Sequence, residues 1–322
     1  MLPDGARERK PARILLPSLS MWRSRRIRRV LQLAGYQPAF GRSNVIAQWG
    51  AGRTSHRAQW ISRKTGQPVV WVEDAFLRSL HPGRGGEPPI GLIIDEDGLY
   101  YDASRPSGLE KLLAEHPLNE DALLRRARHA ISLQIDLDVS KYSAHSAEFR
   151  AGQQNFVLVA DQAHGDLAVS LGGGDQTIFD RMLAAARAEH PGSPIVVKAH
   201  PETSAGHRKG YLDTINGIEN VTVLGGHISP WALLRHARAV YTVTSQLGFE
   251  AILCGHRPVV FGQPFYAGWG LSDDRMPIAR RTRTLTAEQL YAAAMLLYPT
   301  WYDPYRDALA TPENTILSLG AE

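Results

Sequence analysis

Residues 156–166, FVLVADQAHGD, contain the pattern that decides the fold. Five consecutive apolar residues end at Asp161, which is typical of a strand buried on both faces of a parallel sheet. Similar apolar runs that end in polar residues return at 194–200 (PIVVKAH), 239–245 (AVYTVTS) and 257–263 (RPVVFGQ). Helical patterns separate them, at 175–189 and 229–236 among others. The second half therefore predicts βαβ units around a parallel sheet.

The first half has the same alternation in a less regular form. Its sequence predicts strands at 13–16, 44–49 and 67–72 and helices at 20–34 and 54–64. The stretch 88–103 predicts a hairpin with its turn at 95–98, and the tail from Thr286 is predicted to be helical. A polar, weakly patterned stretch at 140–154 marks a boundary. We therefore expect an α/β protein with two Rossmann-like domains, 1–150 and 151–322, whose parallel sheets face a central cleft. The C-terminal helices are expected to pack back on the first domain.

Composition narrows the class of protein. The chain has 322 residues, 43% of them apolar and 21% charged, which is typical of a globular protein. Its single cysteine, Cys254, rules out an intrachain disulfide and a cysteine-based zinc site. No apolar run approaches the ~18 residues of a membrane span. The apolar run near the N-terminus has only about four residues, where a secretory signal needs ~7–15, so a cytoplasmic protein is expected.

The charge is uneven. Net charge is only +4, yet the first 29 residues hold nine Lys or Arg. Such a basic end indicates an anionic partner, lipid headgroups or nucleic acid, or else a solvated helix face. The apolar side of the helix at 20–34 is expected to join the core.

Polar residues follow the predicted strands, where open α/β sheets bind their ligands. Asp161 and Asp166 are carboxylates five residues apart, suited to nucleophilic or base chemistry, or to turns and caps. His200-Pro201 forms a turn whose imidazole could hydrogen-bond a phosphate, a ribose or a base, or could serve the turn alone. The sequence 244–246 (TSQ) opens a helix, where backbone N–H groups and hydroxyls suit a phosphate or serve as an ordinary cap. Gly173 would let a backbone approach a ligand closely.

Two other polar stretches are less specific. Glu73-Asp74 ends a strand and precedes a basic, flexible loop with Arg78 and Arg84, which could hold an anionic substrate or be solvated. The acidic stretches 95–97 and 273–274 are interpreted as turns, and no metal site is assigned to either.

These motifs, in this order, resemble the capsule-polysaccharide β-Kdo transferases of the KpsC type. The matching strings are VEDAFLRSL (72–80), PPIGLIIDEDGLYYDASRPSGLEKLL (88–113), VADQAHGD (159–166), VKAHP (197–201), SPWALLRHARAVYTVTSQLGFEA (229–251) and FGQPFYAGWGLSDDR (261–275). The resemblance implies a GT-B-like fold, a CMP-Kdo donor and no metal cofactor. It also implies retention of the β configuration through a covalent glycosyl-enzyme. Family members often carry two transferase modules, and this chain has the length of one.

The resemblance assigns roles to residues. Asp166 falls on the catalytic aspartate, Glu73 on an acidic position at the acceptor side that would serve as base, and Asp161 would support either. His200-Pro201 falls on the motif that holds CMP, and Thr244-Ser245-Gln246 falls on the stretch that contacts the phosphate. Beyond the resemblance, Lys198, Gln162 and Gly173 are predicted to complete the donor site, with Lys198, Arg78 and Arg84 as candidates for the sugar carboxylate. The predicted acceptor contacts are Asp74, Arg78, Arg84, Phe265, Tyr266 and Trp269.

The expected partners are CMP-Kdo, a Kdo-bearing glycolipid acceptor, the inner membrane at its surface and capsule-assembly proteins, without nucleic acid. Two other functions stay open at the level of the sequence. One is a sialyltransferase-like enzyme that uses another CMP-sugar. The other is a non-catalytic module that binds a glycan or a nucleotide.

Overall fold

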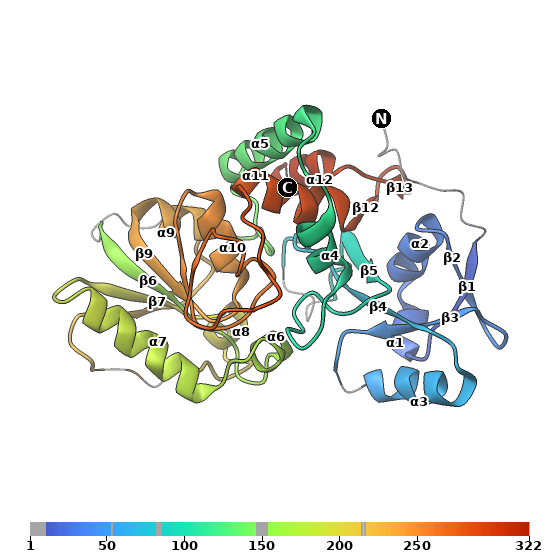
Figure 1. The fold of residues 1–322 in the computed structure, drawn as a ribbon, viewed down its shortest axis with the longest axis horizontal. Helices are drawn as coiled ribbons and strands as arrows, with labels where there is room; N and C mark the ends of the chain where they lie inside the picture. Colours follow the sequence, from blue (N-terminus) through green and yellow to red (C-terminus); the bar gives the residue numbers. More distant parts are fainter. Residues whose placement is uncertain are drawn as a thin grey trace.

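The computed structural model describes residues 11–52, 54–81, 86–145, 154–213, 215 and 217–321. Two sheets lie side by side with helices packed around them (Figure 1). The first sheet has the order β13-β12-β5-β4-β3-β1-β2. Its strands are β1 (Ala12–Leu15), β2 (Tyr36–Ala39), β3 (Val45–Trp49), β4 (Val69–Asp74), β5 (Gly91–Asp95), β12 (Thr300–Asp303) and β13 (Ala308–Leu309).

The second sheet is entirely parallel and has the order β11-β10-β9-β6-β7-β8. The chain moves outward from β6 in one direction and then, from β9 on, in the other. The neighbours β6 and β9 therefore form a topological switch point, the usual ligand site of such sheets. The strands are β6 (Phe156–Ala160), β7 (Ile195–Lys198), β8 (Val221–Leu224), β9 (Ala237–Thr242), β10 (Val259–Val260) and β11 (Asp273–Asp274).

Helices cover both sheets. Those of the first half are α1 (Leu19–Arg23), α2 (Arg25–Leu33), α3 (Ser55–Thr65), α4 (Gly108–Glu115) and α5 (Asp121–Asp136). Those of the second half are α6 (Leu167–Leu171), α7 (Gln176–Glu189), α8 (Pro201–Ser204), α9 (Pro230–His236), α10 (Gln246–Leu253), α11 (Ala287–Tyr291) with a π-helix at Ala292–Leu297, and α12 (Pro312–Gly320). No described helix combines the length and the apolar character that a bilayer crossing requires.

The α/β, GT-B-like fold class predicted from the sequence is confirmed. The five residues of β6 are at most 2% exposed, as expected of a central parallel strand. In α2, Ile27, Val30 and Leu31 are buried at helical spacing, so this helix does turn its apolar face to the core.

Four expectations need correction. The first sheet is mixed, because β5, β12 and β13 run antiparallel to their neighbours. The predicted hairpin at 88–103 has no second strand, since Asp95 accepts the backbone N–H groups of Asp97, Gly98 and Gly108. The helix at 20–34 breaks at Ser24, whose hydroxyl accepts from Ile27 N and caps α2. The tail is only partly helical, because β12 and β13 extend the first sheet.

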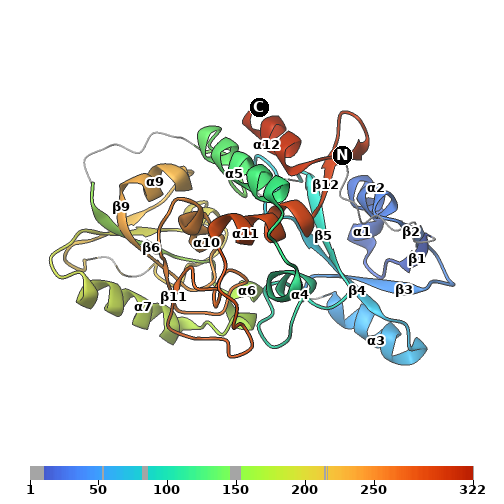
Figure 2. The same cartoon turned by 45° about the horizontal axis from the view of Figure 1, so that its top comes forward.

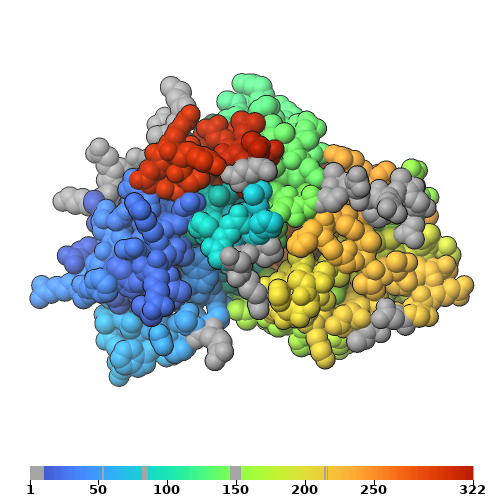
Figure 3. All heavy atoms as spheres, turned by 180° about the vertical axis from the view of Figure 1, so that it is seen from behind, coloured from blue at the N-terminus to red at the C-terminus, as the bar shows by residue number. Residues whose placement is uncertain are grey.

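The C-terminal segment packs against the N-terminal part of the chain, where β12 and β13 contact α2. Figure 2 shows α5 beside α11 and α12, and from behind the C-terminal segment (red) lies against the N-terminal one (blue; Figure 3). Further contacts join the halves. The buried Arg281 forms an ion pair with Glu110, with Nη2 and Oε2 2.8 Å apart, and Gln246 Nε2 donates to the Phe76 carbonyl at 3.0 Å. The predicted boundary at 150/151 lies outside the described residues, so the division into two domains stays a prediction.

Candidate functional site

The site begins with three loops that follow neighbouring strands of the second sheet. Gln162 follows β6, His200 follows β7 and Thr244 follows β9. Gln162 and Thr244 are tied across the switch point: the amide oxygen accepts Thr244 N at 2.9 Å, and the amide nitrogen donates to Thr244 Oγ1 at 3.0 Å. This reciprocal pair fixes the β6 and β9 loops relative to each other.

Asp166 lines the same hollow as Gln162, His200 and Thr244. It is the N-cap of α6, and its Oδ1 accepts Ala168 N at 3.0 Å. The Asp166 side chain lines a hollow between the two halves of the molecule. The other residues of this hollow are Phe76, Tyr100, Tyr101, Lys141, Gln162, Ala168, His200, Thr244, Ser245, Gln246, Pro264 and Phe265.

Asp161 is held by the backbone. Its Oδ1 accepts the N–H groups of Gln162, Tyr211 and Leu212 at 2.8 to 3.1 Å. Burial nevertheless raises its pKa to about 6. An added Cβ at Gly210 would lie 2.1 Å from Asp161 Oδ2, so the 210–212 loop packs directly on this carboxyl group. Asp161 thus ties the start of the loop that leads to Asp166 to the 210–212 loop, and the catalytic support predicted for it stays a prediction.

His200 is a neutral donor that faces the hollow. Burial, followed by the positive charge of Lys141, lowers its pKa to about 4. Its Nδ1 accepts Glu202 N at 3.2 Å and caps α8, which begins at Pro201. With Nδ1 acting as acceptor, the proton of the neutral ring resides on Nε2, and we assign that N–H as a donor to a ligand oxygen.

The segment 244–246 opens α10. The backbone N–H and the hydroxyl of Thr244 both hydrogen-bond to Gln162, so Thr244 positions Gln162. Ser245 Oγ accepts Leu247 N at 3.3 Å, which leaves its hydroxyl proton to donate. Gln246 holds the Phe76 carbonyl of the first half while lining the hollow. Ser245 together with the N-terminus of α10 thus suits an anion.

Glu73 approaches the site from β4 of the first sheet. Burial, with a further contribution from the adjacent Asp74, raises its pKa to about 7. Its Oε2 accepts the Tyr101 hydroxyl at 3.0 Å, and Tyr101 lines the same hollow as Asp166. Gly50 leaves the room for this pair, since a Cβ there would lie 2.8 Å from Glu73 Oε2. Glu73 is thus a carboxyl group that gains and loses its proton near neutral pH.

Lys141 is the residue that sequence reasoning missed. It lines this hollow and an adjoining one. Interactions with Tyr142 and Tyr100 and with the carboxylates of Asp166 and Asp74 raise its pKa against the cost of burial. The segment lacks any periodic pattern and was interpreted as a domain boundary. Contacts with the first half hold it: Arg78 N donates to the Lys141 carbonyl at 3.1 Å. Its one signal was a lysine in an otherwise uncharged stretch, 139–144.

The adjoining hollow shares Lys141, His200, Ser245 and Gln246 with the first and continues under β7 and α10. Lys198 and Glu250 line it. Burial lowers the pKa of Lys198 and raises that of Glu250 to about 7, and Ser140 Oγ donates to Glu250 Oε1 at 2.5 Å. The structure therefore places the predicted Lys198 beside the predicted His200.

The predicted acceptor residues differ in whether they reach the hollow. Phe265 lines the hollow and packs on Phe76, with ring centroids 4.7 Å apart. Tyr266 and Trp269 are corrected to core residues: both are fully buried, and they donate to the carbonyls of Ser245 and Phe265.

The basic loop is also different from its prediction. Arg78 is buried and pairs with Asp74 Oδ2 at 2.7 Å, so it holds the β4 loop rather than an open anion site. Asp74 Oδ1 is buried without a hydrogen-bond partner among the described residues, and it stays a candidate acceptor of a substrate hydroxyl. Arg84 lies outside the described residues. Gly173, with φ of +77°, packs against Met276 and Gln263.

The acidic stretch 95–97 serves the fold. Asp95 accepts three backbone N–H groups and the Tyr298 hydroxyl at 2.5 Å, so its oxygens are occupied. Asp274 likewise accepts Gly268 N and the Ser272 hydroxyl. Within the described ranges no three His, Cys, Asp or Glu side chains gather as a metal site would require.

Comparison with known proteins identifies the family to which this chain belongs. The family model described as "Capsule polysaccharide biosynthesis protein" matches residues 44–149 and 135–300. The chain belongs to this family. Capsule polysaccharide modification protein LipA of Neisseria meningitidis is 36% identical over 300 residues, which are 87% of this chain and 42% of LipA. Lipopolysaccharide-processing protein LpsZ of Rhizobium meliloti is 36% identical over 260 residues, 79% of this chain and 59% of LpsZ. This capsule-family chain thus spans less than two thirds of either relative.

Two solved structures resemble this capsule-family chain over nearly its whole length. Thermosulfurimonas dismutans KpsC, beta Kdo 2,4 transferase, superposes with a TM-score of 0.90 at 34% identity and covers 96% of this chain and 98% of that one. The beta Kdo 2,7 transferase of the same KpsC has a TM-score of 0.70 at 24% identity, with the same coverage, and it supports the fold alone. The predicted membership of the KpsC-type family is confirmed.

Proposed function

We propose that this chain is a β-Kdo glycosyltransferase of capsule polysaccharide synthesis. In this proposal it transfers Kdo from CMP-β-Kdo to a Kdo-bearing, lipid-linked acceptor and retains the β configuration. The observation that carries the proposal is the hollow in which Asp166 meets His200, Ser245 and Lys141. A carboxylate nucleophile, a neutral N–H donor, a hydroxyl donor and a cation converge there from both halves.

The donor would lie at the switch point of the second sheet. CMP carries a single phosphate, and the Ser245 hydroxyl, the His200 Nε2–H and the N-terminus of α10 suit its oxygens. These donors neutralise a leaving phosphate without a metal, and Lys141 adds a fixed positive charge next to it. Lys198 in the adjoining hollow would then face the nucleoside or the sugar carboxylate.

Two displacements would preserve the configuration. In the first, an Asp166 oxygen bonds to the anomeric carbon while the bond from that carbon to the phosphate oxygen breaks and CMP leaves. In the second, the acceptor hydroxyl attacks the same carbon, its proton passes to Glu73, and the bond to Asp166 breaks. Because Glu73 titrates at about 7, it is able to accept this proton and release it again.

The test is intact-protein mass spectrometry after incubation with freshly generated CMP-Kdo and no acceptor. The proposal expects a mass gain of one Kdo residue on the wild-type chain and none on Asp166→Asn. CMP-sialic acid offered in parallel should give no adduct. Adduct formation on Asp166→Asn would overturn the nucleophile, and an adduct from CMP-sialic acid alone would overturn the donor.

A further inference from the structure

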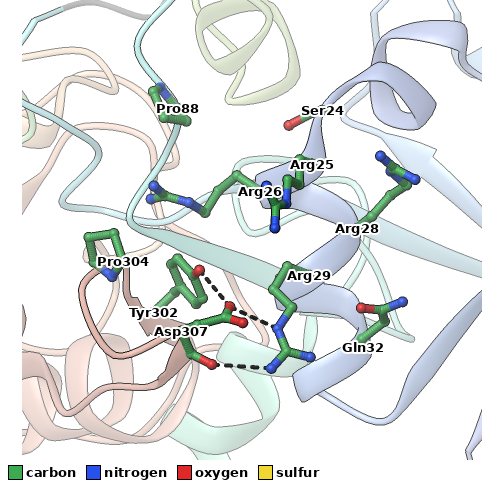
Figure 4. A pocket seen from close by; sticks show the side chains of 10 residues that line it. All are labelled: Ser24, Arg25, Arg26, Arg28, Arg29, Gln32, Pro88, Tyr302, Pro304 and Asp307. Atoms are coloured by element: carbon green, nitrogen blue, oxygen red, sulfur yellow. Dashed lines mark hydrogen bonds and ion pairs between the residues drawn. The ribbon is translucent and has the colours of Figure 1, made fainter.

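One long segment of the chain has no negative charge. Residues 9–72 contain 13 of the 36 Lys and Arg residues and none of the 32 Asp and Glu residues. The segment includes α1, α2 and α3. On α2, Arg25, Arg26, Arg28 and Arg29 line a groove in which Asp307 pairs with Arg29 at 2.8 Å (Figure 4). The groove thus offers four guanidinium groups against one carboxylate.

Exposed apolar side chains adjoin these cations. We call Pro17, Leu19, Trp22, Phe40 and Trp60 the aromatic edge. Leu19 is 60% exposed, Phe40 76% and Trp60 57%, and no other Phe or Trp is exposed among the described residues. Such a cluster on a monomer's surface commonly marks an interaction site.

The members of the aromatic edge connect to one another. Pro17 and Trp60 line one shallow hollow with Arg57. Leu19 begins α1 two residues after Pro17, and Trp22 lies on the same helix one turn later. Trp22 stacks on Phe40 with ring centroids 3.8 Å apart. Arg23 and Arg25 continue the chain from Trp22, so cations border the apolar surface directly.

The aromatic edge lies on the sheet that carries Glu73. Strands β1 to β4 are mutually parallel and lie in the order β4-β3-β1-β2. The end of β2, next to Phe40, is in register with Val69 at the start of β4, about 14 Å across the sheet at three strand spacings. Glu73 follows about 13 Å further along β4, so the aromatic edge and Glu73 lie roughly 20 Å apart on one sheet.

We propose that the aromatic edge and its arginines dock this protein on an anionic lipid bilayer. Phe40, Trp60 and Leu19 would enter the boundary between headgroups and acyl chains, while Arg23, Arg25 and Arg57 contact lipid phosphates. A lipid surface suits the aromatic edge better than a nucleic acid does. Leu19 and Pro17 expose aliphatic surface, which is stabilised by transfer into an apolar phase and not by contact with a nucleic acid. The inference rests on the proposed function in one respect: a lipid-linked acceptor would lie in the bilayer on which the sheet that carries Glu73 docks.

The test is flotation of the full chain with vesicles of phosphatidylcholine, with or without one-third phosphatidylglycerol. We expect binding to the anionic vesicles that weakens with salt and little binding to neutral ones. The double variant Phe40→Ser/Trp60→Ser should partition at least about tenfold less. Arg23→Gln/Arg57→Gln should lose about fivefold per arginine. Matched controls are Tyr305→Ser/Leu317→Ser, exposed apolar residues elsewhere, and Arg181→Gln/Arg187→Gln on α7, which should bind as the wild type does.

Equal loss in the control variants, or none in the edge variants, would overturn the docking surface. So would an aromatic variant that binds like the wild type while RNA competes for binding, since that result indicates a nucleic-acid surface. A lipid-free, soluble acceptor separates this inference from the proposed function, because the edge variants should then transfer Kdo at the wild-type rate. Wild-type transfer without vesicle binding overturns the docking alone. Vesicle binding without transfer to any acceptor overturns the function alone.

Discussion

The two sheets present their functional groups in different ways. At the second sheet, hydrogen bonds between loops fix the groups: Gln162 binds Thr244, and His200 caps α8. At the first sheet, burial next to Asp74 gives Glu73 a pKa of about 7, with Tyr101 as its hydrogen-bond donor. The second sheet therefore carries a prearranged set of donors that includes a neutral histidine. The first sheet carries a carboxyl group that titrates near neutral pH. The proposed transferase would require this difference between its donor side and its acceptor side.

The largest expected effect tests the group between the two edges. Asp166→Asn keeps a side-chain oxygen that caps α6 but removes the nucleophile, so turnover should fall by about a thousandfold or more. Asp175→Asn is the matched control, because Asp175 caps α7 in the same way and accepts Ile178 N at 2.9 Å. Steady-state assays with CMP-Kdo measure both. Similar losses in the two variants would assign the effect to capping.

The next effect separates Glu73 from Glu250, a second carboxyl group whose pKa is raised to about 7 by burial. Glu73→Gln should lower kcat by roughly a hundredfold, since a positioned base contributes about 10²–10⁴. The wild-type rate should rise with pH up to about 7 and then level off, because the carboxylate form accepts the proton. Glu73→Gln should flatten this rise, whereas Glu250→Gln should preserve it although Glu250 also titrates near 7. A rise that disappears only in Glu250→Gln would reverse the comparison.

A smaller effect concerns the donor cradle. His200→Asn retains an N-cap acceptor and loses the Nε2–H, so CMP should bind about tenfold more weakly, as expected for a hydrogen bond to a charged oxygen. With a pKa of about 4, His200 stays neutral from pH 5 to 9, and the loss should not vary with pH in that range. Calorimetric titration with CMP measures it, with His190→Asn as the control. A loss that grows below pH 7 would show that the histidine binds as a cation.

The smallest effect is on stability, and its sign depends on pH. Glu73 has a raised pKa in the folded state, so the native protein loses stability as pH rises from about 4.5 to 7 and stays at the lower level above that. Glu73→Gln should therefore raise the free energy of unfolding by about 2–3 kcal/mol at pH 8 and change it little at pH 4. Glu313→Gln should do the opposite at pH 8. Burial raises the pKa of Glu313, but the hydrogen bond and charge of Arg126, with the hydrogen bonds from the Glu313 backbone and Thr311, together outweigh burial and lower this pKa. Urea titrations at both pH values decide the matter.

The amount of the fold that the sequence revealed differs between the halves. In the second half, continuous apolar runs predicted the strands β6, β7, β9 and β10, and helical patterns at 175–189 and 229–236 predicted α7 and α9. In the first sheet, β2, β12 and β13 escaped prediction. They are strands of two to four residues at or near the sheet edges, and β12 joins the sheet through a partner distant in sequence, as in the pairing of Thr300 with Leu92.

The site divides in the same way. Asp166, His200 and Ser245 each follow a buried strand, so the sequence by itself placed them at one edge of a sheet, and the family resemblance gave them roles. Only the tertiary structure decided that Lys141 joins them and that Tyr266 and Trp269 belong to the core. Local patterns report which side of an element is apolar, because that depends on residue spacing alone. Which polar groups meet across the cleft, and how far burial shifts the pKa of Glu73, depends on packing between segments far apart in the chain.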